Sequence, residues 1–215
     1  MGFRIIRVFN ARRQPRSASR ALGCARHRAS DKGFRRRSAM GKRTILPVEN
    51  LSADTEKFFD VLNKSSDLGV VLVATSYLDA SLGALLHKFL ITSSISDKLL
   101  DVRGGPLGTF SARSDAAYAL ALIERPPYQD LVKIAEIRNE FAHHHLEHDF
   151  QAPVVSELCS KLRYVESLHD GVSDRPLILE QFMAGARNRF VTTVVMLSQR
   201  LLIRGLGLER RGASG

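Results

Sequence analysis

The chain has 215 residues, of which 44% are hydrophobic and 25% charged, proportions typical of one globular domain with its own core. No uninterrupted apolar run reaches about 18 residues, so we expect no membrane span. The two cysteines, Cys24 and Cys159, form no CxxC motif, which disfavours a disulfide framework or a cysteine zinc site and fits a reducing cytoplasm.

The net charge of +10 is unevenly distributed along the chain. Residues 1–40 hold twelve Lys or Arg and one acid, a net of +11, and the remaining residues have a net charge of −1. Three interpretations of residues 1–40 stay open: a disordered nucleic-acid-binding arm, a transit peptide, or an extension upstream of a true start at Met40, which we favour. We expect residues 41–205 to form the domain and residues 206–215 a frayed tail.

From Pro47 onward the chain is predicted to be a succession of helices. Apolar residues recur with a helical period over residues 52–63, 70–91, 111–123, 128–148, 153–167 and 177–203, with a further turn or two at 96–102. In the segment 111–123, the face expected to point to the core is shared by Asp115, Tyr118, Ala119 and Leu122. No convincing alternating strand is present. The fold class is therefore predicted to be all-α, a single-domain bundle of six or seven helices.

Several common functional motifs are absent from the sequence. The Gly- and Pro-rich segment 104–108 lacks the pattern of a phosphate-binding loop, and no nucleophile elbow or Cys–His pairing is found. No helix-turn-helix signature is present. We expect Arg187 and Arg189 in the last helix to form a solvated basic stripe or a local phosphate contact.

The most informative stretch is residues 134–148, which contains four of the seven histidines. On a helix, Arg138 falls in the middle of the arc formed by Leu131, Ile134, Ala135, Phe141, Ala142 and Leu146. A buried guanidinium needs a carboxylate partner, because an unpaired buried charge costs several kcal/mol. We therefore expect a structural ion pair of Arg138 with Asp79 or Asp115, the two acids that point toward the core side.

Arg138, Asn139 and His143 are also candidate catalytic residues. Arginine can stabilise a phosphorane-like transition state, and histidine can act as general base or acid on a ribose 2′-hydroxyl. Five residues of regular helix separate Arg138 and His143 by about 140°, so a shared site needs the helix to end or deform near His143. The pair His144 and His148 lacks the ligands for a convincing metal site, and we expect no cofactor and no metal.

Four phrases in the sequence resemble the mannitol operon repressor (MtlR/MltR-like) family. They are Ala74–Asp79, Gly105–Arg113 with Asp115–Leu120, Ile137–His143, and the helix Arg187–Leu202. The resemblance covers roughly residues 50–204. It implies an all-helical, non-enzymatic, cytoplasmic regulator that represses genes of mannitol uptake and utilisation. Because no DNA-binding motif accompanies it, we expect repression through a protein partner, and we expect a homodimer.

The phrase Arg138–His143 also resembles the R-x4–6-H motif of the HEPN superfamily of helical bundles. This second resemblance implies a metal-independent endoribonuclease, or a toxin-type RNA-binding domain, whose site is completed across a dimer with Asn139 supporting. If the chain is an enzyme, we expect that activity. Nucleic acid could then contact residues 1–40 or the region of Arg138 and His143.

Overall fold

The computed structural model describes residues 45, 47–53, 55–144, 147–168 and 183–209. These residues contain helices and no β-strand, which confirms the all-α prediction. The helices are α1 (Val48–Ala53), α2 (Thr55–Lys64), α3 (Asp67–Phe89), α4 (Ser94–Leu99), α5 (Phe110–Ala119), α6 (Arg125–His143), α7 (Pro153–Ser160), α8 (Tyr164–Ser167) and α10 (Ala186–Leu206). The expected extension 1–40 and most of the expected tail lie outside the described residues, and the domain boundaries stay predictions.

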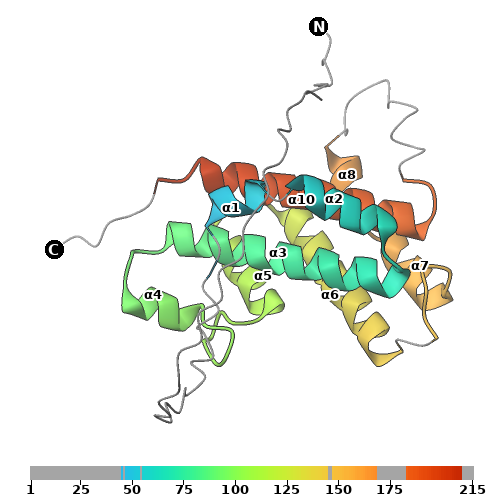
Figure 1. Cartoon of the computed structure of the whole chain (residues 1–215), viewed down its shortest axis with the longest axis horizontal. Helices are drawn as coiled ribbons and strands as arrows, with labels where there is room; N and C mark the ends of the chain where they lie inside the picture. Colours follow the sequence, from blue (N-terminus) through green and yellow to red (C-terminus); the bar gives the residue numbers. More distant parts are fainter. Residues whose placement is uncertain (1–44, 46, 54, 145–146, 169–182, 210–215) are drawn as a thin grey trace, which may run out of the picture. The chain divides into compact units, whose positions relative to one another are not determined.

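Helix α3 is the central element of the bundle (Figure 1). It starts where the Ser66 hydroxyl accepts a hydrogen bond from the Gly69 N–H (3.2 Å), a common way of satisfying the first free amides of a helix. It packs against α2, α5, α6 and α10, so residues on several of its faces are buried. By length and composition α3 could cross a membrane, but 56% of its most apolar window is buried by the rest of the fold, as expected for a core helix.

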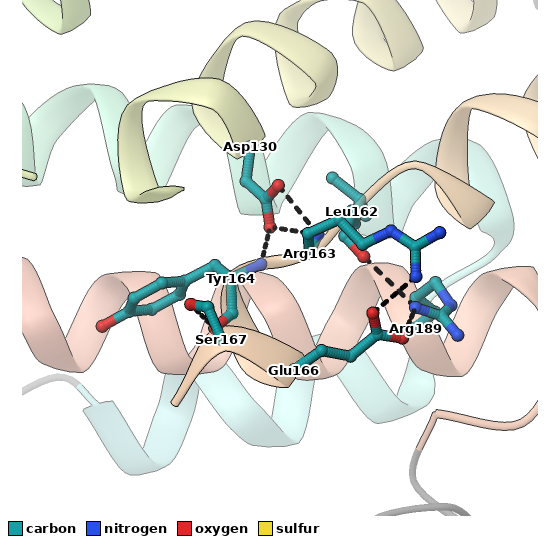
Figure 2. Close-up of polar contacts among 7 residues, drawn as sticks. All are labelled: Asp130, Leu162, Arg163, Tyr164, Glu166, Ser167 and Arg189. Atoms are coloured by element: carbon teal, nitrogen blue, oxygen red, sulfur yellow. Dashed lines mark hydrogen bonds and ion pairs between the residues drawn. The ribbon is translucent and has the colours of Figure 1, made fainter. Parts of the chain in front are cut away.

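The predicted helix 153–167 is divided into α7 and α8 by residues 161–163. The interruption is held by Asp130 of α6, whose side chain is buried with 1% exposed. Its carboxylate accepts hydrogen bonds from the backbone N–H groups of Arg163 (3.0 Å) and Tyr164 (2.8 Å), as Figure 2 shows. Burial raises the pKa of Asp130, and these backbone hydrogen bonds offset part of that rise. The start of α8 is thus fixed by a carboxylate from another helix.

Helix α10 is joined to the bundle by ion pairs. Arg189 lies 2.7 Å from the Glu166 carboxylate and donates to the Leu162 carbonyl (3.2 Å), beside the Asp130 contacts (Figure 2). Arg187 pairs with Asp67 at the start of α3 and donates to the Ser65 carbonyl (2.9 Å). The expectation of a solvated basic stripe at these two arginines is wrong, because both meet carboxylates across helix junctions.

One sequence-based boundary and one helix face differ from the structure. The last helix begins at Ala186, directly after Gly185, which has a positive φ of 76° that favours glycine; residues 177–182 lie outside the described residues. In α5 the buried residues are Phe110, Arg113, Ser114 and Ala117. Asp115 and Tyr118 are exposed, so the face predicted to be buried in this helix is wrong.

Replacing Asp130 by alanine should destabilise the fold by about 1–3 kcal/mol for each of the two backbone amides left without an acceptor. Asp149 offers a matched control, since its carboxylate also accepts two backbone N–H groups, from Gln151 and Ala152, but is exposed. We expect Asp149→Ala to cost about 1 kcal/mol, as for a typical helix cap. Urea denaturation followed by circular dichroism measures both, and equal losses would contradict the role given to Asp130.

Candidate functional site

The loop between α4 and α5 is folded so tightly that two of its positions admit only glycine. A Cβ atom at Gly105 would lie 2.5 Å from the carbonyl oxygens of Lys98 and Leu99, and one at Gly108 would lie 2.5 Å from that of Asp101. No neighbouring backbone can move away from such contacts without breaking the turn. The Gly-Pro-Leu-Gly phrase is therefore a structural requirement of this loop rather than a phosphate-binding element.

The loop is held by Arg113 of α5, which is buried with 3% of its surface exposed. Its guanidinium donates to the carbonyls of Leu107 (Nε, 2.9 Å), Leu100 (Nη2, 3.0 Å) and Asp79 (Nη1, 3.2 Å). The same Nη1 lies 2.9 Å from the Asp79 carboxylate. Space for the guanidinium comes from Gly83, where a Cβ would lie 3.3 Å from it. One side chain thus joins α3, the end of α4, the loop and α5.

The Asp79 carboxylate lies between two arginines. Burial raises the pKa of Asp79, and Arg113 counteracts part of that rise through its charge and a hydrogen bond. The charge of Arg138 offsets a further, smaller part of the rise in the pKa of Asp79. The Asp79 side chain is 31% exposed, so this ion pair lies at the edge of the core.

Arg138 is half-buried rather than central to the core. The buried residues of α6 include Leu131, Ile134, Ile137 and Phe141, which turns the core-facing arc away from Arg138 and leaves Ala142 exposed. The guanidinium of Arg138 donates to the Asn139 side-chain oxygen (3.0 Å). A direct ion pair of Arg138 with Asp79 or Asp115 stays a prediction; in the structure the Asp79 carboxylate pairs with the Arg113 guanidinium.

Arg138 and His143 do not converge within the chain. Helix α6 continues through His143, so their side chains leave it in directions about 140° apart. His143 is exposed at the last helical residue. Beyond it the rings of His144 and His148 lie 4.5 Å apart, with His148 Nδ1 3.9 Å from Glu140 Oε2. Within the described ranges, no group of three or more His, Cys, Asp or Glu side chains is arranged to hold a metal ion.

A pocket of about 300 Å³ opens on the surface between α5 and α6. Its apolar part consists of Leu131, Val132 and Ala135, and its polar part consists of Ser111, Ser114, Asp115, Tyr128, Glu136 and Asn139. The Tyr128 hydroxyl donates to Asp115 (3.0 Å), and its ring stacks on Tyr118 with centroids 4.5 Å apart. That hydrogen bond to Asp115 raises the pKa of Tyr128. Of the site residues named in the sequence analysis, Asp115 and Asn139 both line this pocket.

Sequence reasoning missed Arg113 and most of this pocket. Phe110, Arg113, Ser114 and Ala117 have the spacing of one helical face, and this spacing alone could have predicted a buried arginine in α5. The pocket residues of α6 also follow a helical period, from Tyr128 through Leu131, Val132 and Ala135 to Asn139. Nothing in the sequence indicated that α5 would lie beside them.

Replacing Arg113 by alanine should destabilise the protein by about 3–5 kcal/mol, because the half-buried Asp79 carboxylate and three carbonyl groups lose their partner. We expect Arg113→Lys to recover only part of this, since an ammonium cannot reproduce the guanidinium fork. The control is Arg138→Ala, for which we expect about 1 kcal/mol or less. Chemical denaturation measures all three. A loss at Arg138 as large as that at Arg113 would instead support the ion pair predicted for Arg138.

We expect no cleavage of single-stranded RNA by the purified protein, because Arg138 and His143 diverge on a regular helix. The assay compares wild type with His143→Ala, each with and without EDTA. RNA cleavage that persists in EDTA and disappears in His143→Ala would overturn this expectation and support the HEPN-type ribonuclease.

The mannitol repressor family model matches residues 69–206, which is more than half of the chain and includes Asp79, Arg113, Arg138 and the pocket. No curated protein sequence matches. The fold is similar to a chain in the X-ray structure of the MtlR–HPr complex from Escherichia coli, with 20% identity, a TM-score of 0.54 and coverage of 69% of this chain and 98% of that chain. A possible transcriptional regulator, YggD, from Shigella flexneri 2a str. 2457T gives 15% identity, a TM-score of 0.48 and coverage of 72% and 96%. The family match shows that this chain belongs to the mannitol repressor family.

Proposed function

We propose that this chain is a cytoplasmic transcriptional regulator of the mannitol repressor type that acts through a protein partner rather than by reading DNA with its folded part. Family membership supports the regulatory role. The observation that carries the partner-mediated mode is the pairing of three of the four arginines on α10. A DNA-binding helix needs cationic side chains that are free to meet phosphates.

Three of the four α10 arginines are instead paired within the bundle, and the fourth, Arg204, is exposed in the last turn of the helix. Arg187 meets Asp67, Arg189 meets Glu166, and Arg200 meets Glu124 at the start of α6. Hydrogen bonds and charge from Arg163 and Arg189 outweigh the effect of burial and lower the pKa of Glu166, so this partner is charged at neutral pH. Each phosphate contact at these arginines would require the breaking of an ion pair that joins two helices.

For the partner we propose an HPr protein, since the similar Escherichia coli structure is an MtlR–HPr complex. The likeness at 20% identity supports a common fold, and the partner of this chain is our proposal. We further propose that the chain is a homodimer. Nucleic-acid contacts, where they occur, are proposed to come from residues 1–40 or from the region of Arg138 and His143, rather than from α10.

The proposal predicts saturable binding of HPr to the full chain, and DNA binding that does not distinguish operator from unrelated duplex. Fluorescence anisotropy with both duplexes between about 50 and 200 mM salt, a range in which counterion release strongly changes the affinity for DNA, tests the second part. A variant with Arg35, Arg36 and Arg37 all replaced by serine should lose most of the DNA affinity and keep HPr binding. Operator-specific binding that survives in this variant would contradict the partner-mediated mode.

A further inference from the structure

The pocket between α5 and α6 has no part in the proposed regulation, and its lining restricts what it can bind. Its three apolar residues, Leu131, Val132 and Ala135, form a small aliphatic wall next to the polar groups. At about 300 Å³ it lies at the lower end of the range for small-molecule sites, so it suits a ligand of about a dozen non-hydrogen atoms.

The charges around the pocket balance one another. Glu136 is paired with Lys133, whose ammonium lies 2.8 and 2.9 Å from its two oxygens. The other lining carboxylate, Asp115, accepts the Tyr128 hydroxyl, and the Arg138 guanidinium lies next to Asn139. Two acids and two bases leave no excess of either sign. An ionic ligand would therefore lose its hydration without gaining a counter-charge, and an uncharged ligand is favoured.

The polar groups offer both hydrogen-bond donors and acceptors. Because the Asn139 oxygen is occupied by Arg138, its NH₂ group is the part available to a ligand as a donor. Asp115 has a second oxygen beyond the one that accepts from Tyr128, and the Tyr128 oxygen keeps lone pairs. Ser114 donates to the Phe110 carbonyl (2.9 Å), so toward the pocket its hydroxyl can only accept. A ligand hydroxyl both donates and accepts hydrogen bonds, so this combination of donors and acceptors can form both bonds with it.

We propose that this pocket binds a small, uncharged polyhydroxylated molecule of about hexitol size. Its hydroxyl groups donate to Asp115 and accept from the Asn139 amide, and its carbon skeleton lies against the aliphatic wall. The Tyr128 ring, supported by its stack on Tyr118, forms one side of the site. The inference goes beyond the proposed function, because it requires neither HPr nor DNA. For a ligand of this size we expect a dissociation constant on the order of millimolar.

The test is a titration of the full chain followed by NMR of side-chain amides, with D-sorbitol and D-mannitol as probes and putrescine and inorganic phosphate as ionic comparisons. Polyols also stabilise proteins by exclusion from their surface, so a shift of the melting temperature is not diagnostic. We expect saturable shifts of the Asn139 amide with the hexitols and none with the ionic probes. Absence of saturation with both hexitols, or tighter binding of either ionic probe, would overturn the proposal.

Two variants locate the binding. Ala135→Leu fills the pocket, and Asn139→Ala removes the amide donor at an exposed position, where the fold is not at risk. Isothermal titration should give at least tenfold weaker hexitol binding for either variant. Asn63→Ala, an exposed amide on α2, is the matched control and should bind as wild type does. Hexitol binding that is unchanged in Asn139→Ala and in a folded Ala135→Leu would place the ligand elsewhere and overturn the assignment.

Discussion

The arrangement of α3, α4 and α5 depends on the contacts of the buried Arg113 guanidinium, which joins α5 to α3, to the end of α4 and to the loop. A loop that turns at Gly105 and Gly108 cannot form backbone hydrogen bonds for all its carbonyl groups, and buried carbonyls without donors are costly. Arg113 supplies donors to Leu107 and Leu100 and pairs with Asp79. An arginine suits this place because its planar fork reaches several acceptors at once while remaining charged.

Charged side chains that meet backbone groups and one another also organise the contacts of α7, α8 and α10. Asp130 provides acceptors where a helix would otherwise run on, and Arg187 and Arg189 bring α10 onto the ends of α3 and α8. Charged side chains in this fold therefore act mainly on backbone groups and on one another at helix junctions. The folded part has nearly equal numbers of acidic and basic residues, and many of its arginines are used in these internal pairs. This pairing is the physical basis for proposing that regulation works through a protein partner.

The all-α class and the positions of the helices could be predicted because apolar residues recur with a helical period in α2 and α6, and because α3 is a long, mostly apolar segment. The side chains that form the site could not be predicted in the same way. Over residues 110–122 the sequence allows two helical faces, one with Asp115, Tyr118 and Leu122 and one with Phe110, Arg113 and Ala117. A short segment with few large apolar residues does not distinguish them. The choice is made by Asp79, which lies far away in the sequence, and by the glycine turn directly before α5, whose need for donors the sequence does not reveal. The ion pair predicted for Arg138 with Asp79 or Asp115 stays a prediction, whereas the pair of Asp79 with Arg113 of α5 was not foreseen.

Helix α5 connects the structural centre to the pocket, because its two faces serve different purposes. Arg113 and Ala117 face the core, while Ser111 and Asp115 line the pocket, and Ser114 belongs to both. A helix whose buried face is fixed by an ion pair and three carbonyl contacts cannot rotate without losing them. The pocket residues of α5 are therefore held at a constant distance from those of α6. Such preorganisation reduces the ordering cost of binding a weak, flexible ligand, and without it a shallow polar pocket of this size would have little affinity.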